Sequence, residues 1–434
     1  MIEKLAKLLP KEEKENIKIS FLLINLIKTK GEKEMKKQLL IFVTLIMVAS
    51  MIAGCASSQP TTAPATTSNE ATEAPVVSPT EEVAAAPSMP ERKKIGVIIW
   101  GTEDGLSSSV KRELDFAGEA LNIEVIYKTG DYDTEAQVIA AENFVAAGVD
   151  GIIAVPLIDS GIPKIYKVCE DAGIPYIQAF RRIDDPTNAA QLAEAPYFLG
   201  FTVENEEQAG YDLLQILADA GGTTVGTIYN APGSSFADRR KEGIEKGFAD
   251  GIATKVVEYT LPLSPTSDAW VESTNNFINA YPELNGIIMT SGSVGGAEAA
   301  IATIIKNDAV GKVKMVTFDQ PANANEAFDQ GILVGLASGI YMDPLYSFVI
   351  MANYLQGTPL SEEPIYIASN YIYIKNTQDS QDYTTYVDGE GIFPYSAEEI
   401  QQMTRFYNPS FTAEDLQKIA SDWSMENVLA KAKQ

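Results

Sequence analysis

The stretch Gly148–Pro156 reads GVDGIIAVP, and its middle part decides the fold class. Gly151–Val155 is a short apolar run without alternation, which is typical of a strand buried on both faces. Before it, Thr134–Ala147 has helical spacing and ends at Gly148, a helix-stop signal. After it, Pro163–Ala172 has helical spacing again. The stretch therefore predicts a strand between two helices.

The same alternation continues on both sides of this unit. We predict further strands at Ile95–Trp100, Glu124–Tyr127, Pro175–Ala179, Thr224–Tyr229, Thr254–Tyr259, Gly286–Thr290 and Lys314–Phe318. We predict further helices at Ser108–Leu121, Glu206–Ala220, Arg239–Asp250, Ala269–Ala280 and Gly296–Asn307. Strands that alternate with helices of this length indicate an α/β protein with parallel sheets.

A short internal echo indicates two such units. Gly148–Ile153 (GVDGII) is followed by Glu283–Ile288 (ELNGII) in the same strand–helix context. Two similar α/β lobes would place a cleft at the carboxyl ends of their strands, where open α/β sheets bind ligands. The loops expected there are Trp100–Leu106, Pro156–Ser160, Phe180–Asp184, Asn230–Phe236, Ser291–Gly295 and Asp319–Asn323.

The first part of the chain has the composition of a secretory segment. Leu39–Gly54 is apolar and uncharged, follows Met35-Lys36-Lys37 and ends before Cys55, which is typical of a signal peptide. Ile52-Ala53-Gly54-Cys55 resembles the lipobox of bacterial lipoproteins, which implies cleavage before Cys55 and lipidation of its sulfur. An uncleaved membrane anchor is the alternative, and translation starts at Met1 or at Met35.

We therefore interpret 1–54 as a leader with a lipoprotein signal peptide. Residues 55–91 are rich in Ala, Thr, Pro, Ser and Glu and poor in large apolar residues, so we expect a disordered tether. Lipidation and an uncleaved anchor both place the folded part outside the cytoplasm on a membrane surface, and with lipidation we expect the anchor to be Cys55.

Composition excludes several function classes. The chain has 33 Lys+Arg, 59 Asp+Glu, no histidine and two cysteines, with a net charge of −26. Without histidine there is no Ser-His-Asp or Cys-His pair, and two cysteines are too few for a Cys₄ zinc site. The acidity argues against nucleic acid as a partner. We expect no metal site and no cofactor, and we interpret Cys169 as a small core residue.

Several local segments resemble the periplasmic sugar-binding proteins of the ribose/galactose type. They are Gly148–Ile153 with Pro156, Asp171–Pro175 before a strand, Ala231–Ser235 with Arg240–Gly243, and Phe318-Asp319. Their order over about Lys94 to Lys375 carries the resemblance. It implies two Rossmann-like lobes joined by a three-strand hinge, the type I periplasmic binding protein architecture.

The resemblance also implies discontinuous lobes and a partner. The first lobe would hold 92–202 with 340–370, and the second 203–339 with 371–377. Ligand bound between the lobes favours their closed state, and an ABC permease recognises the closed form. We expect a monomer.

The family's pocket is kept only in part. Its Asp-Arg pair after the fourth strand is Phe180-Arg181 here, so the carboxylate is lost. The family Arg falls on Asp238, the Asn-Asp pair on Ser291-Gly292, and the Gln before the last crossing near Ser338. The carboxylate of Asp319 is kept. A ribose pocket is therefore not reproduced.

We expect ligand contacts from Trp100, Glu103, Asp104, Phe180, Arg181, Phe236, Asp238, Ser291, Asp319 and Ser338. Aromatic rings can form walls against the C–H faces of a sugar, while Arg and Asp bind hydroxyl groups. Core packing is the alternative for the three rings, an inter-lobe ion pair for Arg181 and Asp319, and a solvated loop for Glu103 and Asp104. Several carboxylates near the cleft leave a cationic or polyhydroxylated ligand open and disfavour a phosphorylated one.

The chain continues past the usual end of the family. Ser396–Glu399 and Thr412–Asp415 resemble capping boxes, so we predict helices in a C-terminal extension, 378–434. Pro409 separates them, and aromatic residues give the extension apolar surface to pack on the lobes. We hypothesise that it modifies permease docking.

Three functions remain open. The first is a lipid-anchored, non-enzymatic solute-binding protein that delivers a sugar or related polar solute to an ABC importer. The second is a ligand-sensing receptor subunit for a membrane signalling protein. The third is an extracellular hydrolase, for which the carboxylates show no distinctive pair.

Overall fold

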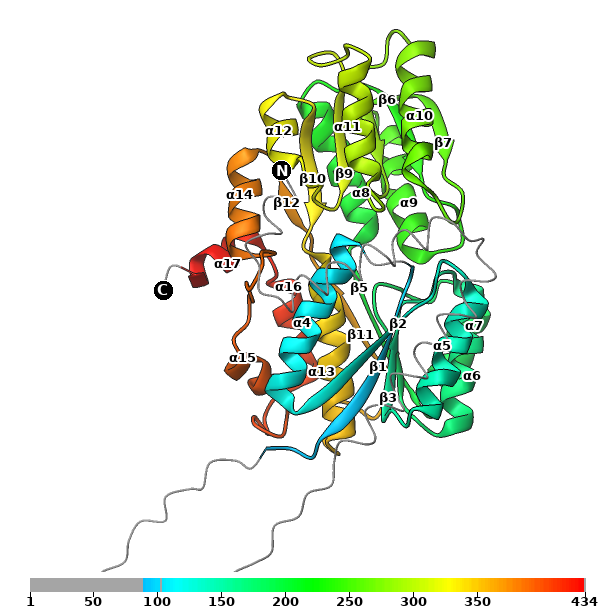
Figure 1. Ribbon diagram of the computed structural model, residues 1–434, viewed down its shortest axis with the longest axis vertical. Helices are drawn as coiled ribbons and strands as arrows, with labels where there is room; N and C mark the ends of the chain where they lie inside the picture. Colours follow the sequence, from blue (N-terminus) through cyan, green and yellow to red (C-terminus); the bar gives the residue numbers. More distant parts are fainter. Residues whose placement is uncertain (1–88, 102–103, 433–434) are drawn as a thin grey trace, which may run out of the picture. The chain divides into compact units, whose positions relative to one another are not determined.

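The computed structural model describes residues 89–101 and 104–432 (Figure 1). The expected signal peptide, Cys55 and nearly all of the expected tether lie outside the described residues, as does Glu103. Within the described ranges, no helix combines the length and apolar character needed to cross a membrane.

The described chain is built on two six-stranded sheets. Sheet 1 has the order β11-β5-β4-β3-β1-β2, with β1 Lys93–Ile99, β2 Ile123–Thr129, β3 Gly151–Ala154, β4 Tyr176–Gln178, β5 Phe198–Glu204 and β11 Ile365–Ser369. Sheet 2 has the order β12-β10-β9-β8-β6-β7, with β6 Thr224–Tyr229, β7 Thr254–Thr260, β8 Gly286–Met289, β9 Lys314–Phe318, β10 Leu333–Ser338 and β12 Ile372–Ile374. We call the parts built on these sheets lobe 1 and lobe 2.

The two sheets share one topology, which confirms the predicted α/β fold class. All strand pairs are parallel except β10–β12. Gly151 and Gly286, the glycines of the sequence echo, begin β3 and β8. These strands occupy the same place in the two sheets, so the echo marks corresponding strands of two similar lobes.

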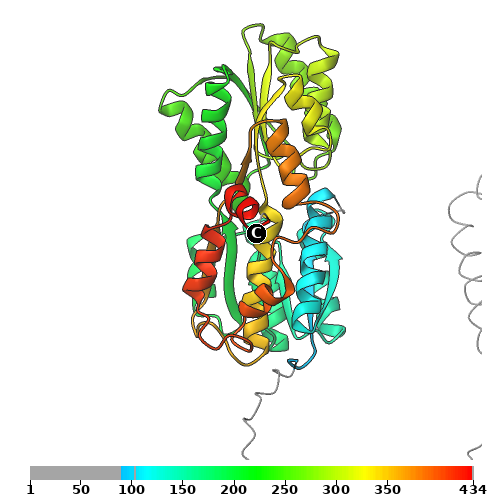
Figure 2. The ribbon, with the colours of Figure 1, turned by 90° about the vertical axis from the view of Figure 1, so that its left-hand side faces the viewer.

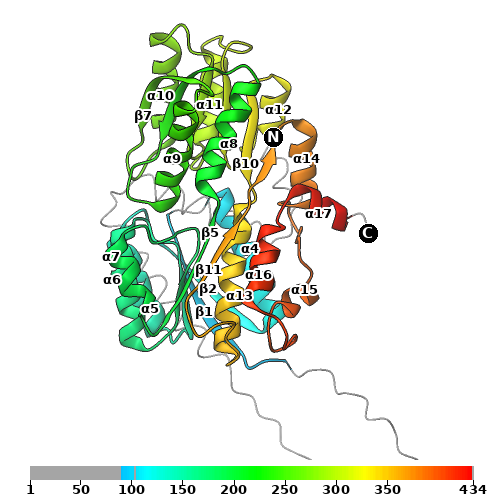
Figure 3. The ribbon, with the colours of Figure 1, turned by 180° about the vertical axis from the view of Figure 1, so that it is seen from behind.

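Helices cover both faces of each sheet (Figures 1 and 3). In lobe 1 they are α4 Gly105–Leu121, α5 Thr134–Ala146, α6 Ile162–Ala172, α7 Pro186–Ala193 and α13 Asp343–Leu355, with the short η2 Asp159–Gly161 and η3 Ile340–Met342. In lobe 2 they are α8 Glu206–Asp219, α9 Ser235–Ala249, α10 Ser267–Ala280, α11 Gly296–Lys306 and α12 Ala324–Asp329. α4 packs with α13, α5 with α6, α8 with α9, and α10 with α11.

Two predicted helix starts are wrong, and both errors affect the site. α4 begins at Gly105 rather than at Ser108, because Asp104 caps it and accepts a hydrogen bond from the Ser107 amide. α9 begins at Ser235 rather than at Arg239, with the acidic side chain of Asp238 in its first turn. Apolar periodicity does not reveal such polar first turns.

The chain passes between the lobes three times, as predicted for a three-strand hinge. The crossings are Asn205 between β5 and α8, Gly339 between β10 and η3, and Asn370-Tyr371 between β11 and β12. All three lie on neighbouring strands at one side of the two sheets. The loops at the strand ends of both lobes therefore face one another across the hinge.

The C-terminal extension is helical, as predicted. Its helices are α14 Thr377–Tyr386, α15 Ala397–Gln402, α16 Ala413–Ser421 and α17 Met425–Ala432. The capping boxes expected at Ser396 and Thr412 are both present, at the starts of α15 and α16. Asn353 of α13 donates to the Met403 carbonyl and accepts from the Arg405 amide. The extension therefore packs on the lobes, as expected.

Cys169 lies inside lobe 1, which confirms its interpretation as a core residue. Its side chain is fully buried on α6 and forms no disulfide. Burial raises the pKa of its thiol to about 12, so the reactive thiolate is suppressed.

Candidate binding cleft

A cavity of ≈ 100 Å³ lies between the lobes at the carboxyl ends of their strands. Of the residues expected to contact ligand, seven line it: Trp100, Asp104, Phe180, Arg181, Phe236, Ser291 and Asp319. Their role as ligand contacts stays a prediction. The small volume follows from the closeness of the two lobes in this structure.

The lobes touch directly beside this cavity. The Asp159 amide donates to the Gly233 carbonyl across the cleft at 3.0 Å. Arg239 of α9 forms an ion pair with Asp184 of lobe 1 at 2.8 Å. The structure therefore shows a closed arrangement of the lobes.

Aromatic rings form two walls of the cavity. Trp100 at the end of β1 contacts the edge of Phe180, with ring centroids 5.8 Å apart. The Phe236 ring lies against the guanidinium groups of Arg181, at 4.2 Å, and Arg240, at 4.9 Å. The rings are therefore held by other protein groups, and they combine core packing with a position in the cavity wall.

Three residues that line the cavity have left-handed backbone: Tyr132 with φ 53°, Phe180 and Asp319. Phe180 after β4 has φ 60°, and Asp319 after β9 has φ 64°. β4 and β9 occupy the same place in the two sheets. A left-handed Phe costs conformational energy and is kept only where other contacts hold it; here the Phe180 amide donates to Asp343 at 2.9 Å. Of this pair, the strained backbone is therefore that of Phe180, since Asp tolerates the left-handed region.

Arg240 of α9 is held in a fixed position beside the cavity. It donates to Glu206 at 2.6 Å, to the hydroxyl of Tyr371 at 2.6 Å and to the Thr290 carbonyl at 2.7 Å. Burial alone would lower the pKa of Arg240, but Glu206 and Tyr371 raise it above its usual value. Its charge is neutralised within the protein, so it does not call for an anionic ligand.

Arg181 is the second buried cation. It is 8% exposed, and it donates to the carbonyls of Pro156 and Phe180. Burial lowers its pKa to about 10, so it stays charged at neutral pH. No ion pair of Arg181 occurs among the described residues, and its guanidinium lies at the cavity against Phe236.

Asp319 supplies a carboxylate from lobe 2. Burial raises its pKa to about 6, although the nearby charge of Arg240 acts in the opposite direction. At pH 7 the group is mainly ionised, and it can accept hydrogen bonds from hydroxyl or amino groups.

Two other expected contacts, Asp238 and Ser338, do not line the cavity, whereas Asp104 lines it from a fixed position. Asp238 is directed at its own loop, because its carboxylate accepts from the Gly233 amide at 2.9 Å. Ser338 donates to the hydroxyl of Tyr383 at 3.1 Å and does not line the cavity. Asp104 is not a free loop charge: it caps α4 and accepts from the Trp100 indole at 3.3 Å.

Sequence reasoning missed several cavity residues. Tyr132 follows β2, and Pro262, Leu263 and Pro265 follow β7. These are the edge strands, whose end loops the prediction left out. Glu206 and Arg240 were missed as cavity residues because they belong to helices. The signal for them would have been an acidic and a basic residue at helix positions expected to be buried.

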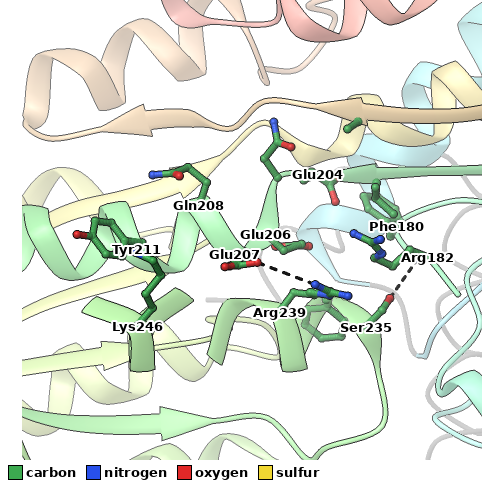
Figure 4. A pocket seen from close by; sticks show the side chains of 14 residues that line it. Phe180, Arg182, Glu204, Glu206, Glu207, Gln208, Tyr211, Ser235, Arg239 and Lys246 are labelled. Atoms are coloured by element: carbon green, nitrogen blue, oxygen red, sulfur yellow. Dashed lines mark hydrogen bonds and ion pairs between the residues drawn. The ribbon is translucent and has the colours of Figure 1, made fainter. Parts of the chain in front are cut away.

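A second cavity of ≈ 520 Å³ shares Phe180, Glu206 and Phe236 with the first in its lining. Figure 4 shows this second cavity. Residues of α8 and α9 make up much of its lining, and Arg239 of α9 pairs with Glu207 of α8 at 3.9 Å. Although larger, it meets strand ends of lobe 1 only, at Phe180, Glu204 and Ala368, whereas the smaller cavity is lined by strand-end loops of both lobes. The smaller cavity is therefore the candidate site.

The described residues contain no group of three or more Cys, Asp or Glu side chains arranged to hold a metal ion. The cavity instead combines aromatic walls with amide, hydroxyl, guanidinium and carboxylate groups. Such a lining suits a small polar molecule.

Comparison with known proteins agrees with this geometry. The family described as "periplasmic binding protein domain" matches residues 95–357. A xylitol-binding protein of Mycolicibacterium smegmatis is 24% identical over 282 residues, 64% of this chain and 76% of that protein. A fructose import binding protein of Bifidobacterium longum is 27% identical over 248 residues, 56% of this chain and 73% of that protein.

Solved structures share the fold. A periplasmic solute-binding protein of an ABC transporter from Actinobacillus succinogenes, with bound D-allose, has a TM-score of 0.59 at 20% identity. The match covers 67% of this chain and 100% of that one. Together, the two-lobed topology, the hinge and the family match over residues 95–357 show that this chain belongs to the periplasmic binding protein family, whose members act outside the cytoplasm.

Proposed function

We propose that this chain is a lipid-anchored solute-binding protein that captures a neutral sugar or polyol and delivers it to an ABC importer. The observation that carries the proposal is the cavity itself, where Trp100, Phe180 and Phe236 face hydrogen-bonding groups of both lobes. Rings bind the C–H faces of such solutes, and Arg181 and Asp319 suit their hydroxyl groups.

Charge supports a neutral ligand. Arg240 is paired with Glu206, and the carboxylates of Asp104 and Asp319 also line the cavity. A phosphorylated solute would meet these carboxylates, and Arg181 alone among the lining residues described would offer it a cation without an ion pair. The relatives named for xylitol and fructose are consistent with this choice.

A thermal-shift panel tests the ligand class. The probes are xylitol, D-fructose, D-ribose, D-allose and myo-inositol, with glucose 6-phosphate and L-leucine for comparison. A solute at ~1,000 times its dissociation constant adds ~4 kcal/mol to the free energy of unfolding, which raises the melting temperature by several degrees. Stabilisation by leucine or the phosphate ester, and by none of the five neutral solutes, would contradict the proposal.

Delivery and anchoring need separate experiments. We propose that Cys55 carries the lipid, and that Cys55→Ser releases the protein from membranes and removes incorporation of labelled palmitate. Uptake of the bound solute should then fall in cells that carry only this variant. Solute binding with normal uptake in cells that lack the protein would favour the sensing role instead.

We further propose a non-enzymatic monomer with the lobe boundaries given above, 92–202 with 340–370 and 203–339 with 371–377. Recovery of each solute unchanged after incubation, and a monomer mass in solution, are the expected outcomes.

A further inference from the structure

The C-terminal extension contacts both lobes and the hinge, and we call residues 376–432 the strap (Figure 2). Its first helix, α14, belongs to lobe 2, where it packs on α12. Thr377 donates to Asp329 of α12 at 2.5 Å, and Gln320 after β9 donates to Ser380 and Thr384 at 3.2 Å. The beginning of the strap is thus attached to lobe 2.

The next part of the strap is attached to lobe 1. Asp388 accepts from Ser109 at 2.7 Å and forms an ion pair with Arg112, both on α4. Phe393 stacks on Phe116 of the same helix, with ring centroids 4.0 Å apart. α15 then runs along α4. Within a few residues after α14, the strap therefore passes from one lobe to the other.

The strap also binds the second crossing. The Tyr383 hydroxyl accepts from the Gly339 amide at 3.0 Å, and the Trp423 indole donates to the Gly339 carbonyl at 3.1 Å. Both backbone polar groups of Gly339 are thus held by strap side chains. Gly339 has φ 85°, and a Cβ added there would lie 3.0 Å from the Trp423 nitrogen. A change in the backbone torsion angles of Gly339 would therefore disturb its contacts with the strap.

The third crossing is held in the same way (Figure 3). Gln417 of α16 pairs with both the amide and the carbonyl of Ala368, at the free edge of β11. Asn370 donates to the Ser421 carbonyl at 2.6 Å. α17 contacts α14, which closes the strap on itself. Two of the three crossings are therefore bound by one segment.

We propose that the strap is an additional link between the lobes that restrains the hinge in favour of the closed arrangement. Every contact named above occurs while the lobes touch through Asp159–Gly233 and Asp184–Arg239. A rotation of one lobe displaces α12 relative to α4, so the strap must deform or lose contacts. Because a ligand between the lobes selects the closed state, a strap that favours this state raises the apparent affinity. This role rests on the proposed function.

The test measures lobe motion without any ligand. Nitroxide labels are placed at Glu142→Cys on α5 and Glu272→Cys on α10, both on exposed helix faces, in the full chain with Cys55→Ser. The test variant combines Tyr383→Phe and Trp423→Phe, which keeps an aromatic ring at each position and removes the bonds to Gly339, together with the bond between Ser338 and Tyr383. The control is Lys418→Gln, which removes only the exposed ion pair with Asp422 inside the strap. Pulsed electron paramagnetic resonance gives the inter-lobe distance distribution.

We expect a broader distribution with longer distances in the double variant and an unchanged one in the control. The apparent Kd for any solute found by the panel should rise about threefold to tenfold, the scale of one lost hydrogen bond. A folded double variant with the wild-type distribution would overturn the proposal.

Should the double variant fail to fold, Asp388→Asn replaces it, because this change weakens the link to α4 from a half-buried site. The same two outcomes then apply to its distance distribution. Failure of the solute panel would leave these ligand-free distances interpretable, so the two proposals fail separately.

Discussion

Glu113 is a fully buried carboxyl group on α4 with no hydrogen-bond partner among the described residues. Burial raises its pKa to about 8, and Asp388 adds to the rise while Arg112 and Lys431 oppose it. The folded protein thus holds a proton that the unfolded chain loses near pH 4.5. This contribution to stability is fully present below about pH 4.5 and is lost as the pH rises through about 8.

We predict that Glu113→Gln removes this loss of stability at high pH, because the Gln side chain mimics the protonated acid. The variant should match the wild type at pH 5 and melt several degrees higher at pH 9. Melting temperatures across this range are the measurement. Parallel curves for the two proteins would show that Glu113 is already ionised at neutral pH.

Asp319 is the residue whose loss should affect binding most directly. Asp319→Asn removes the charge and keeps a residue that tolerates left-handed backbone. We expect the Kd for the bound solute to rise about tenfold or more, since a charged hydrogen bond contributes ~1.5–3 kcal/mol. The control is Asp308→Asn, an exposed position with φ 54° outside the cavity. Equal affinities in calorimetric titrations would remove Asp319 from the site.

At the scale of elements, α8 and α9 approach each other through glycines. A Cβ at Gly243 of α9 would lie 1.8 Å from the Glu207 carbonyl oxygen, and one at Gly210 of α8 would lie 2.2 Å from the Arg240 oxygen. Backbone atoms cannot yield as a flexible side chain can. This contact also sets the position of Arg240 against Glu206, at the cavity.

We predict that Gly243→Ala forces the two helices apart and lowers stability by ~1–3 kcal/mol or more. Gly105→Ala is the matched control, because nothing lies within 4 Å of a Cβ added at the start of α4. Chemical denaturation measures both. A Gly243→Ala protein as stable as the control variant would mean that the helix pair can rearrange.

The extension also explains an unusual helix. α13 is buried along nearly its whole length, including Tyr346, Phe348 and Asn353. A helix that is apolar all round needs cover on every side. Sheet 1 and α4 cover one part, and the extension covers another through contacts with α16 and with residues 403–405.

At the scale of the whole molecule, ion pairs between the lobes contribute to closure. Asp184 pairs with Arg239 across the cleft and with its neighbour Arg182. We predict that Asp184→Asn raises the apparent Kd by up to about fivefold, because a part-exposed ion pair contributes at most ~1 kcal/mol. The effect should shrink at high salt.

Asp171→Asn, which removes an exposed pair with Lys167 inside lobe 1, serves as the control. Titrations of both variants at low and high salt are the measurement. A salt-independent effect of Asp184→Asn would indicate a steric cause rather than an electrostatic one.

The sequence by itself determined the fold class, the number of lobes and most of the strand-end loops around the cavity. Short apolar strands such as Gly151–Val155 and the echo at Gly286 report burial locally, so periodicity is enough to find them. The caps at Ser396 and Thr412 are equally local signals.

Only the tertiary structure decided how distant residues meet. The network of Arg240, Glu206 and Tyr371 joins two helices and a crossing, and Trp423 reaches Gly339 from the far end of the chain. Asp238 is the opposite case, because the sequence placed it at the cavity. It lies in the first turn of α9, and its carboxylate accepts from the Gly233 amide of its own loop. Such pairings depend on three-dimensional packing, because no spacing along the chain encodes which side chains of different elements come into contact.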